Sequence, residues 1–102
     1  MREVDISPRA QDDLDHIAAH IAARDPDAAR RVILRILDTF DRLASFPELG
    51  RRRPRHAVGI RSFAVRPYPY VIFYYIREDR IEMAHVLHGR RDMARVLREE
   101  QR

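Results

Sequence analysis

Five ionisable side chains fall within the eight residues "HVLHGRRD", which follow an apolar strand pattern near the end of the chain. They are His85, His88, Arg90, Arg91 and Asp92. To cleave RNA without a metal ion, a site must take the proton of a 2′ hydroxyl, stabilise charge on the phosphorane and protonate the leaving oxygen. Histidine and arginine are the residue types that suit these steps.

A ribonuclease hypothesis would make His85 the base and Arg61 or Arg66 the clamp on the phosphate. Strict alternation along the strand, however, groups His85 with Ile81, Met83 and Leu87 on an apolar side. No tyrosine or histidine follows His88 to complete the set of proton-transfer groups. His88 is then expected to cap the strand end, with Asp92 starting the last helix and pairing with an arginine. The pattern favours a structural or docking role for this cluster over catalysis.

A second cluster of charge lies in "PELGRRRPRHAVG", a segment with two glycines, two prolines and no periodicity, which predicts a loop. Four guanidinium groups within five residues give a dense positive potential. A solvated loop, a seat for an acidic partner peptide and a grip on phosphates are all open, and direct contact with nucleic acid is not the favoured one. The arginines are Arg51, Arg52, Arg53 and Arg55.

Asp12, His16 and His20 recur every four residues, so on a helix they would form one stripe. Two imidazoles and a carboxylate could bind a metal ion. The stripe lies opposite the apolar face, and the metalloprotease pattern His-Glu-x-x-His is absent. A solvated polar face is the favoured interpretation, and no metal or other cofactor is expected.

Composition excludes several kinds of chemistry. All twenty basic residues are arginine, and there is no cysteine, so Schiff bases, lysine-containing phosphate loops, disulfides and thiolate metal sites are ruled out. The formal charge of +4 favours an anionic partner, either nucleic acid or an acidic protein. The longest apolar run, "YVIFYYI", is far shorter than the roughly 20 residues of a membrane helix. The start is too polar for a signal peptide, so a cytoplasmic protein is expected.

Two helices are predicted in the first half of the chain. Ser7 and Pro8 form a helix start, because serine accepts a bond from an unpaired amide and proline loses nothing at the first helical position. "RDPDA" marks a break and a second start, with Asp25 as the cap and Pro26 as the first residue. Apolar residues recur at spacings of three and four along both segments. The second segment ends before Pro47, and the two should form an antiparallel hairpin.

Four strands are predicted around this hairpin. The first covers residues 2–6, and three more follow the arginine-rich loop near "IRSFAV", "YVIFYYIR" and "IEMAHVLH" as an antiparallel meander. The middle strand of the three is apolar on both parities, which indicates a central position in the sheet. Its aromatic residues Phe73 and Tyr74 are therefore predicted to belong to the core rather than to stack on bases.

The predicted fold class is α+β in one domain over residues 1–102. It has an N-terminal strand, an antiparallel helical hairpin packed on a small antiparallel sheet, and a short C-terminal helix. The hairpin covers one face of the sheet, and Phe63 and Tyr75 are expected on a partly uncovered, wet face of aromatics and arginines. The last helix is predicted after Gly89 from the spacing of Met93, Val96 and Leu97.

With these elements in place, the chain resembles the toxins of bacterial type II toxin–antitoxin systems, the RelE/ParE group, and ParE in particular. "ISPRAQDDLDHIAAHIA", "LASFPELGRR", "GIRSFAVRPYPYVIFYYI" and "VLHGRRD" match the family in order along the chain, and the last two are the specific ones. The residues on motif positions are Arg61, Tyr70, Phe73, Tyr74, His88, Arg91 and Asp92.

The resemblance implies a toxin that forms a hetero-oligomer with a ParD-like antitoxin, whose C-terminal segment wraps it, and DNA gyrase as the target. Ribonuclease members of the wider group cut messenger RNA at the ribosome, and this chain lacks their lysines and their C-terminal tyrosine or histidine. His85 stands where the family often has an arginine, which keeps the ribonuclease alternative open. Candidate residues for binding the antitoxin or the target are Arg51, Arg52, Arg53, Arg55, Arg61, Tyr75, His88, Arg90, Arg91 and Asp92.

Overall fold

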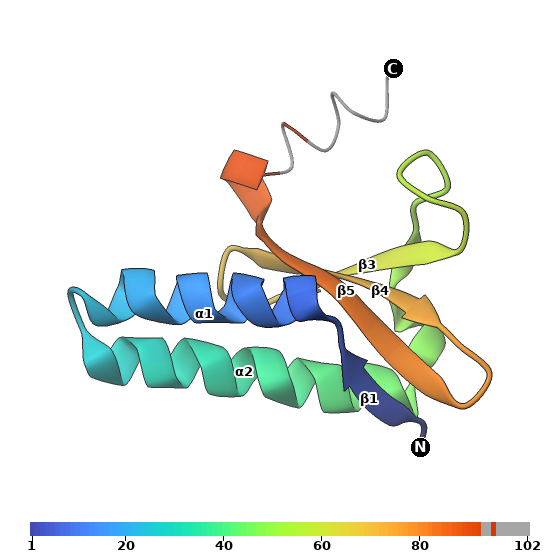
Figure 1. Cartoon of the computed structure of the whole chain (residues 1–102), viewed down its shortest axis with the longest axis horizontal. Coiled ribbons are helices and arrows are strands. Elements are labelled where there is room, and N and C mark those ends of the chain that lie inside the picture. Colours follow the sequence, from blue (N-terminus) through green and yellow to red (C-terminus); the bar gives the residue numbers. More distant parts are fainter. Residues whose placement is uncertain (93–94, 96–102) are drawn as a thin grey trace.

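Two long helices lie side by side against one face of a five-stranded sheet in the computed structural model, which describes residues 1–92 and 95 (Figure 1). In chain order the elements are β1 (Glu3–Ile6), α1 (Pro8–Ala22), α2 (Pro26–Ser45), the short 3₁₀ helix η1 (Pro47–Leu49), β2 (Arg51–Arg52), β3 (Ile60–Val65), β4 (Tyr70–Ile76) and β5 (Arg80–His88).

The helix starts are those that the sequence predicts. The Ser7 side chain accepts a hydrogen bond from the Ala10 amide at 3.0 Å, and the Asp25 carboxylate accepts one from the Ala28 amide at 3.1 Å. A proline occupies the first turn of each helix. These caps bind amides that have no partner within the helix. The hairpin prediction is confirmed, and both helices turn their apolar stripes to the sheet.

The sheet has the order β1-β5-β4-β3-β2. The meander β3-β4-β5 is antiparallel as predicted, but β1 pairs parallel to β5, with Glu3 opposite Arg80 and Ile6 opposite Met83. The predicted fold class is confirmed, and the parallel pairing of β1, which the sequence did not predict, makes the sheet mixed. A parallel neighbour needs a long crossover, and the two helices between β1 and the rest of the sheet supply it.

Part of the predicted arginine loop is also a strand. Arg51 pairs with Ser62 and Arg52 with Arg61, so that β2 forms the outer edge of the sheet beside β3. The loop proper begins at Arg53 and ends at Gly59, whose φ of 81° is a conformation that favours glycine. The first two arginines are thus fixed to the sheet by backbone pairing, although their side chains are exposed.

A β-bulge interrupts β5. Tyr74 pairs with Met83 but Phe73 pairs with His85, which leaves Ala84 as an extra residue. A bulge changes which side of the sheet the following residues face. The prediction that His85 shares a face with Ile81 and Met83 is wrong for this reason.

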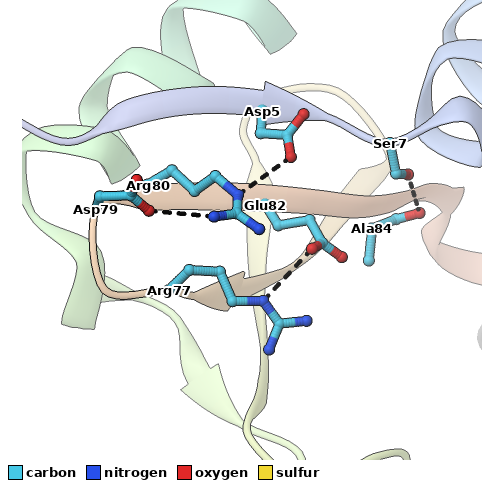
Figure 2. Close-up of polar contacts among 7 residues, drawn as sticks. All are labelled: Asp5, Ser7, Arg77, Asp79, Arg80, Glu82 and Ala84. Atoms are coloured by element: carbon cyan, nitrogen blue, oxygen red, sulfur yellow. Dashed lines mark hydrogen bonds and ion pairs between the residues drawn. The ribbon is translucent and has the colours of Figure 1, made fainter.

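Two contacts from the N-terminal part of the chain hold this bulge. The Ser7 hydroxyl donates to the Ala84 carbonyl at 3.1 Å, and the Asp13 carboxylate accepts from the Val86 amide at 2.9 Å. Figure 2 shows the bond between Ser7 and the Ala84 carbonyl. It also shows the ion pair between Arg80 of β5 and Asp5 of β1. The bonds of Ser7 and Asp13 thus pair backbone groups of β5 beyond Met83, where its pairing with β1 ends.

Apolar side chains form a large cluster between helices and sheet and a small one on the opposite face. The large cluster includes Phe40, Ile72 and Tyr74. The small cluster consists of Ile60, Phe73 and Leu87, with partly buried neighbours around them. Phe73 and Tyr74 are each fully buried, which confirms them as core residues.

The open face of the sheet carries only part of the predicted wet aromatic surface. Tyr75 lies there, with the Arg77 guanidinium 4.4 Å from its ring centroid. Phe63 instead packs against the large cluster on the helix side, which corrects its predicted position. Its register partner Ile72 faces the same way, because paired residues of neighbouring strands share a face.

Residues 89–92 are helical and begin the predicted C-terminal helix. Met93, Val96 and Leu97, on which that prediction rests, lie outside the described residues. Within the described part of the chain, neither long helix combines the length and the apolar character that crossing a membrane requires.

Candidate functional site

β2 and the loop after it form an edge of the sheet that carries Arg51, Arg52, Arg53 and Arg55, called the arginine-bearing edge below. A buried tyrosine fixes the chain just ahead of this edge. The Tyr74 hydroxyl donates to the Pro47 carbonyl and accepts from the Gly50 amide at 2.8 Å. Arg61 donates to the Gly50 carbonyl, also at 2.8 Å. Burial raises the pKa of Tyr74, and its bond to Gly50 and the charge of Arg61 oppose that rise. Arg61 therefore holds the chain ahead of β2, rather than projecting as an independent phosphate clamp.

In the loop after β2, the side chain of Arg53 is hydrogen-bonded to the sheet, whereas the side chains of the other arginines of this edge are exposed. The Arg53 side chain donates to the Ser62 hydroxyl at 2.8 Å, and its carbonyl accepts from the amides of His56 and Ala57. The predicted binding residues Arg51, Arg52 and Arg55 are exposed. This edge presents guanidinium groups on a fixed backbone, which suits an acidic partner surface.

His85 lies on the open face, in contact with the same loop. Its ring is edge-on to His56, with centroids 6.2 Å apart, and edge-on to Phe73 at 6.4 Å. Its Nδ1 atom is buried and has no hydrogen-bond partner among the described residues. Burial lowers the pKa of His85, and the positive charge of Arg9 lowers it further. A lowered pKa favours the neutral imidazole, which is the form that a general base uses.

The other residues of the ribonuclease hypothesis do not lie with His85. Arg61 pairs with Tyr74 on the helix side of the sheet, whereas His85 pairs with Phe73 on the opposite side. Arg66 follows β3, where its carbonyl accepts a bond from the Arg35 side chain on α2. The structure does not bring the three predicted residues together.

The end of "HVLHGRRD" is a capped helical turn. The Asp92 carboxylate accepts from the His88 amide at 2.7 Å, and the Arg91 amide donates to His88 Nδ1 at 3.3 Å. The His88 ring also packs edge-on to Tyr70, with centroids 5.7 Å apart. His88 ends the strand as predicted, but Asp92 binds a backbone amide, and no ion pair joins it to an arginine within residues 1–92. The predicted binding residues Arg90 and Arg91 are exposed.

A groove between α2 and β3 has a volume of about 430 Å³. Along its β3 side the sheet edge is open, because β2 pairs only with Arg61 and Ser62 and, in the described chain, no strand lies outside residues 63–65. Arg35 and Arg42 are seven residues apart, which places them on the same face of one helix. This spacing could have indicated the groove from the sequence. The groove is lined by Arg35, Asp38, Thr39, Arg42, Phe63, Ala64 and Arg66.

The stripe of Asp12, His16 and His20 does lie along α1. His16 Nδ1 donates to the Asp12 backbone carbonyl at 2.8 Å, so the ring binds its own helix. Among residues 1–92 and 95, no three histidine, aspartate or glutamate side chains gather in a geometry that could hold a metal ion.

Comparison with known proteins places this architecture in a family. The family model for the ParE toxin of type II toxin–antitoxin systems (parDE) matches residues 4–93. The chain belongs to the ParE toxin family. The family resemblance of the sequence motifs is thereby confirmed.

Curated relatives of this ParE-family chain carry both names of the group. The relative named "Putative toxin Y4kP", of Sinorhizobium fredii, is 39% identical over 89 residues, which are 87% of this chain and 90% of the relative. Toxin RelE2 of Caulobacter vibrioides is 36% identical over 83 residues, covering 81% of this chain and 90% of the relative. A solved structure from the chromosomal ParDE toxin–antitoxin system of P. aeruginosa has a TM-score of 0.75 at 20% identity, over 86% of this chain and 96% of that one. That likeness concerns the fold.

The family motif residues of this ParE-family toxin fall into two groups. Tyr70, Phe73 and Tyr74 are buried and support the sheet, and Arg61 belongs with them because it is bound to the Gly50 carbonyl. Arg91 is exposed, while His88 and Asp92 are partly buried beside it in the capped turn at the end of β5. Surface residues are the ones that can contact a partner, so the second group belongs with the arginine-bearing edge and the α2–β3 groove as candidate docking surfaces.

Proposed function

We propose that this ParE-family toxin acts by binding DNA gyrase, without bond-making chemistry of its own, and that a ParD-like antitoxin neutralises it. The observation that carries the proposal is the separation of His85 from Arg61 and Arg66, with Arg61 engaged by Gly50. Acid–base catalysis requires groups within hydrogen-bond reach of the same reacting atoms. The cytoplasm, where gyrase works on the chromosome, is the compartment that the proposal implies.

The antitoxin segment occupies the α2–β3 groove in this proposal. Extended peptides bind open sheet edges through their backbone, and amphipathic segments bury apolar side chains in grooves. Phe63 provides an apolar wall, and the guanidinium groups of Arg35, Arg42 and Arg66 match an acidic segment. Charges at such a rim set the association rate and the register more than the affinity.

The target is tested by two assays on the purified toxin. Gyrase supercoiling should be inhibited, or gyrase-dependent DNA breaks should appear, while messenger RNA in a reconstituted translation mixture stays intact. When the antitoxin encoded beside the toxin is added to the same assays, the inhibition of supercoiling and the DNA breaks should disappear. Cleaved messages together with undisturbed supercoiling would contradict the proposal.

The antitoxin site is tested by charge reversal. Arg35→Glu combined with Arg42→Glu should slow association with the antitoxin at least tenfold at low salt, because both groups line the groove. Arg51→Glu with Arg52→Glu tests the neighbouring edge in the same way. Arg24→Glu with Arg30→Glu, at exposed positions of the hairpin, is the matched control. Equal association rates for all variants would rule out this location.

A ribonuclease is the second candidate, favoured by one observation. His85 has a partly buried ring with a lowered pKa, and its Nδ1 has no hydrogen-bond partner within residues 1–92 and 95. If the chain cuts messages at the ribosome, His85→Gln should abolish cleavage and His20→Gln should not. Absence of cleavage by the unaltered protein would end this alternative.

A further inference from the structure

A basic cleft of about 350 Å³ lies between α1 and the end of β5. In Figure 1 the end of β5 rises beside α1, whereas the loop between β2 and β3 lies at the opposite side of the view. The α1–β5 cleft is thus separate from the arginine-bearing edge and from the α2–β3 groove. It is lined by Arg9, Asp13, His16, Ile17, His20, Tyr70, Val86, Leu87, His88, Arg91, Asp92 and Arg95.

Its three guanidinium groups come from distant parts of the chain. Arg9 is in the first turns of α1, and Arg91 and Arg95 follow β5. All three are exposed, and none forms an ion pair within the part of the chain that the structure describes. Converging guanidinium groups with unused donors suit an anion that has several oxygens.

The two carboxylates of the cleft are already engaged. Asp13 accepts from the Val86 amide, and Asp92 accepts from the His88 amide. Each bond fixes one side of the cleft, the first by joining α1 to the bulged strand and the second by capping the turn that carries Arg91. The carboxylates therefore shape the cleft and leave the guanidinium donors to a ligand.

The histidines of the cleft have nitrogen atoms with defined roles. His16 Nδ1 donates to the Asp12 carbonyl, so in the neutral ring its Nε2 is an acceptor. His88 Nδ1 accepts from the Arg91 amide, so in the neutral ring Nε2 carries the proton and can donate. His20 follows His16 by one turn of the same helix.

The cleft has an apolar floor on the helix side of the sheet, formed by Ile17, Tyr70 and Val86. Small-ligand sites combine such a floor with a few convergent polar groups, within about 300 to 1,000 Å³. The volume suits one small ligand with a flat apolar body and a charged end. An acidic peptide would need an extended groove, because its charges are spaced along a backbone.

We infer that the α1–β5 cleft binds a nucleotide, with the phosphate held by Arg9, Arg91 and Arg95 and the base placed against the apolar floor. A planar guanidinium group donates two parallel hydrogen bonds to a pair of phosphate oxygens. A single carboxylate has fewer oxygens and would leave more of these donors unused. The nucleotide is either a free mononucleotide or one unit of a single strand. This inference does not depend on whether gyrase is the target.

The inference is tested on the full chain by titration with adenosine 5′-monophosphate, followed by calorimetry and by the histidine ring signals in NMR spectra. Saturable 1:1 binding is expected, with shifts at His16, His20 and His88. Adenosine, which lacks the phosphate, should bind at least tenfold more weakly. A fluorescent ten-nucleotide single strand forms the second arm. Binding of the strand identifies a polynucleotide as the source, and its exclusion identifies the free nucleotide.

Variants connect the binding to the cleft. Arg9→Gln with Arg91→Gln should weaken binding of the monophosphate at least tenfold, whereas Arg24→Gln with Arg30→Gln, which removes the same charge elsewhere, should not. Arg9→Gln alone is the second variant, because this exposed side chain makes no hydrogen bond in the described chain and its loss should leave folding intact. No binding of either probe, equal losses in both double variants, or tighter binding of an oligoglutamate peptide would overturn the inference.

Discussion

Tyr74 and His85 lie almost opposite each other across neighbouring strands, yet the two faces of the sheet treat their buried polar atoms differently. The Tyr74 hydroxyl, on the helix side, has partners in Pro47 and Gly50. His85 Nδ1, on the open side, is buried without one among the described residues, as is Arg2 Nε ahead of β1. An unpaired buried polar group costs free energy, and such groups in native proteins point to strain or to a functional role. The core is therefore complete around Tyr74, whereas around His85 the open face has a polar atom that a partner could complete.

Apolar packing shows the same contrast. The cluster under the helices contains most of the fully buried side chains, among them Phe40 and Ile72. The cluster on the open face has three buried residues, with Tyr75 partly exposed beside them. We therefore expect the free energy of unfolding to depend mainly on the helix side of the sheet, and the open face to accommodate changes of side chain more easily. Four changes test this difference, from the largest expected effect to the smallest.

Phe40→Ala should lower the free energy of unfolding by about 3–5 kcal/mol, since it empties a position that is 1% exposed at the centre of the large cluster. Urea denaturation followed by circular dichroism measures the loss. Tyr75→Ala, on the open face, is the comparison and should cost clearly less. Equal losses from the two substitutions would break the contrast between the faces.

Gly50→Ala should lower stability by about 1–3 kcal/mol, because an added Cβ would lie 2.6 Å from Cε1 of Tyr74. The ring is fully buried and must shift, which also disturbs its bonds to Pro47 and to the Gly50 amide. The midpoint of thermal or urea unfolding measures the effect. Gly89→Ala is the matched control, because its added Cβ would meet no atom closer than 3.4 Å. A stable Gly50→Ala variant would show that the Tyr74 anchor can move.

His85→Phe should reduce the loss of stability between pH 7 and pH 5. Burial lowers the pKa of His85 in the folded protein, so the unfolded chain binds the proton more readily. Stability is then fully present above the ordinary histidine pKa and decreases as the pH falls below it. Urea midpoints at several pH values measure the profile. His85→Gln, which does not titrate either, should flatten it in the same way, and an unchanged profile in both variants would disprove this role of the open face.

Glu82→Gln should change stability by less than about 1 kcal/mol, since its ion pair with Arg77 spans 3.4 Å between partly exposed side chains. Figure 2 shows this pair near the start of β5. A double-mutant cycle with Arg77→Gln, at low and high salt, isolates the coupling energy. A coupling that is larger than the effect of Gly50→Ala would mean that the surface of the open face contributes as much as the anchor beneath the helices.

Features that depend on neighbouring residues were predictable from the sequence. The caps at Ser7 and Asp25 act over three residues, and the helix stripes repeat every three or four, so both appeared in the structure as expected. The three antiparallel strands were found from their alternation and their turns. The sequence motifs of the ParE family covered the same elements.

The site was predictable by residue type but not by role. Arginine content marked the edge around β2, yet only the structure shows Arg61 bound to Gly50 and Arg53 bound to Ser62. The groove containing Arg35 and Arg66 joins a helix to the end of a strand, and their side-chain contact spans 31 residues. Sequence patterns that extend over one helical turn or one strand do not reveal a contact of this kind.

Taken alone, the sequence determined the two long helices, four of the five strands, the two-layer class and the absence of lysine and thiol chemistry, because these follow from residue types and from contacts within one helical turn or one strand. The tertiary structure decided which face His85 occupies and how β1 enters the sheet. The first depends on the bulge at Ala84, which is held by Ser7 and Asp13 through bonds that span 77 and 73 residues, and the second on the pairing of β1 with the distant β5. Contacts across such separations form only when the whole chain has folded, and they assign each ionisable group to a partner or to open surface.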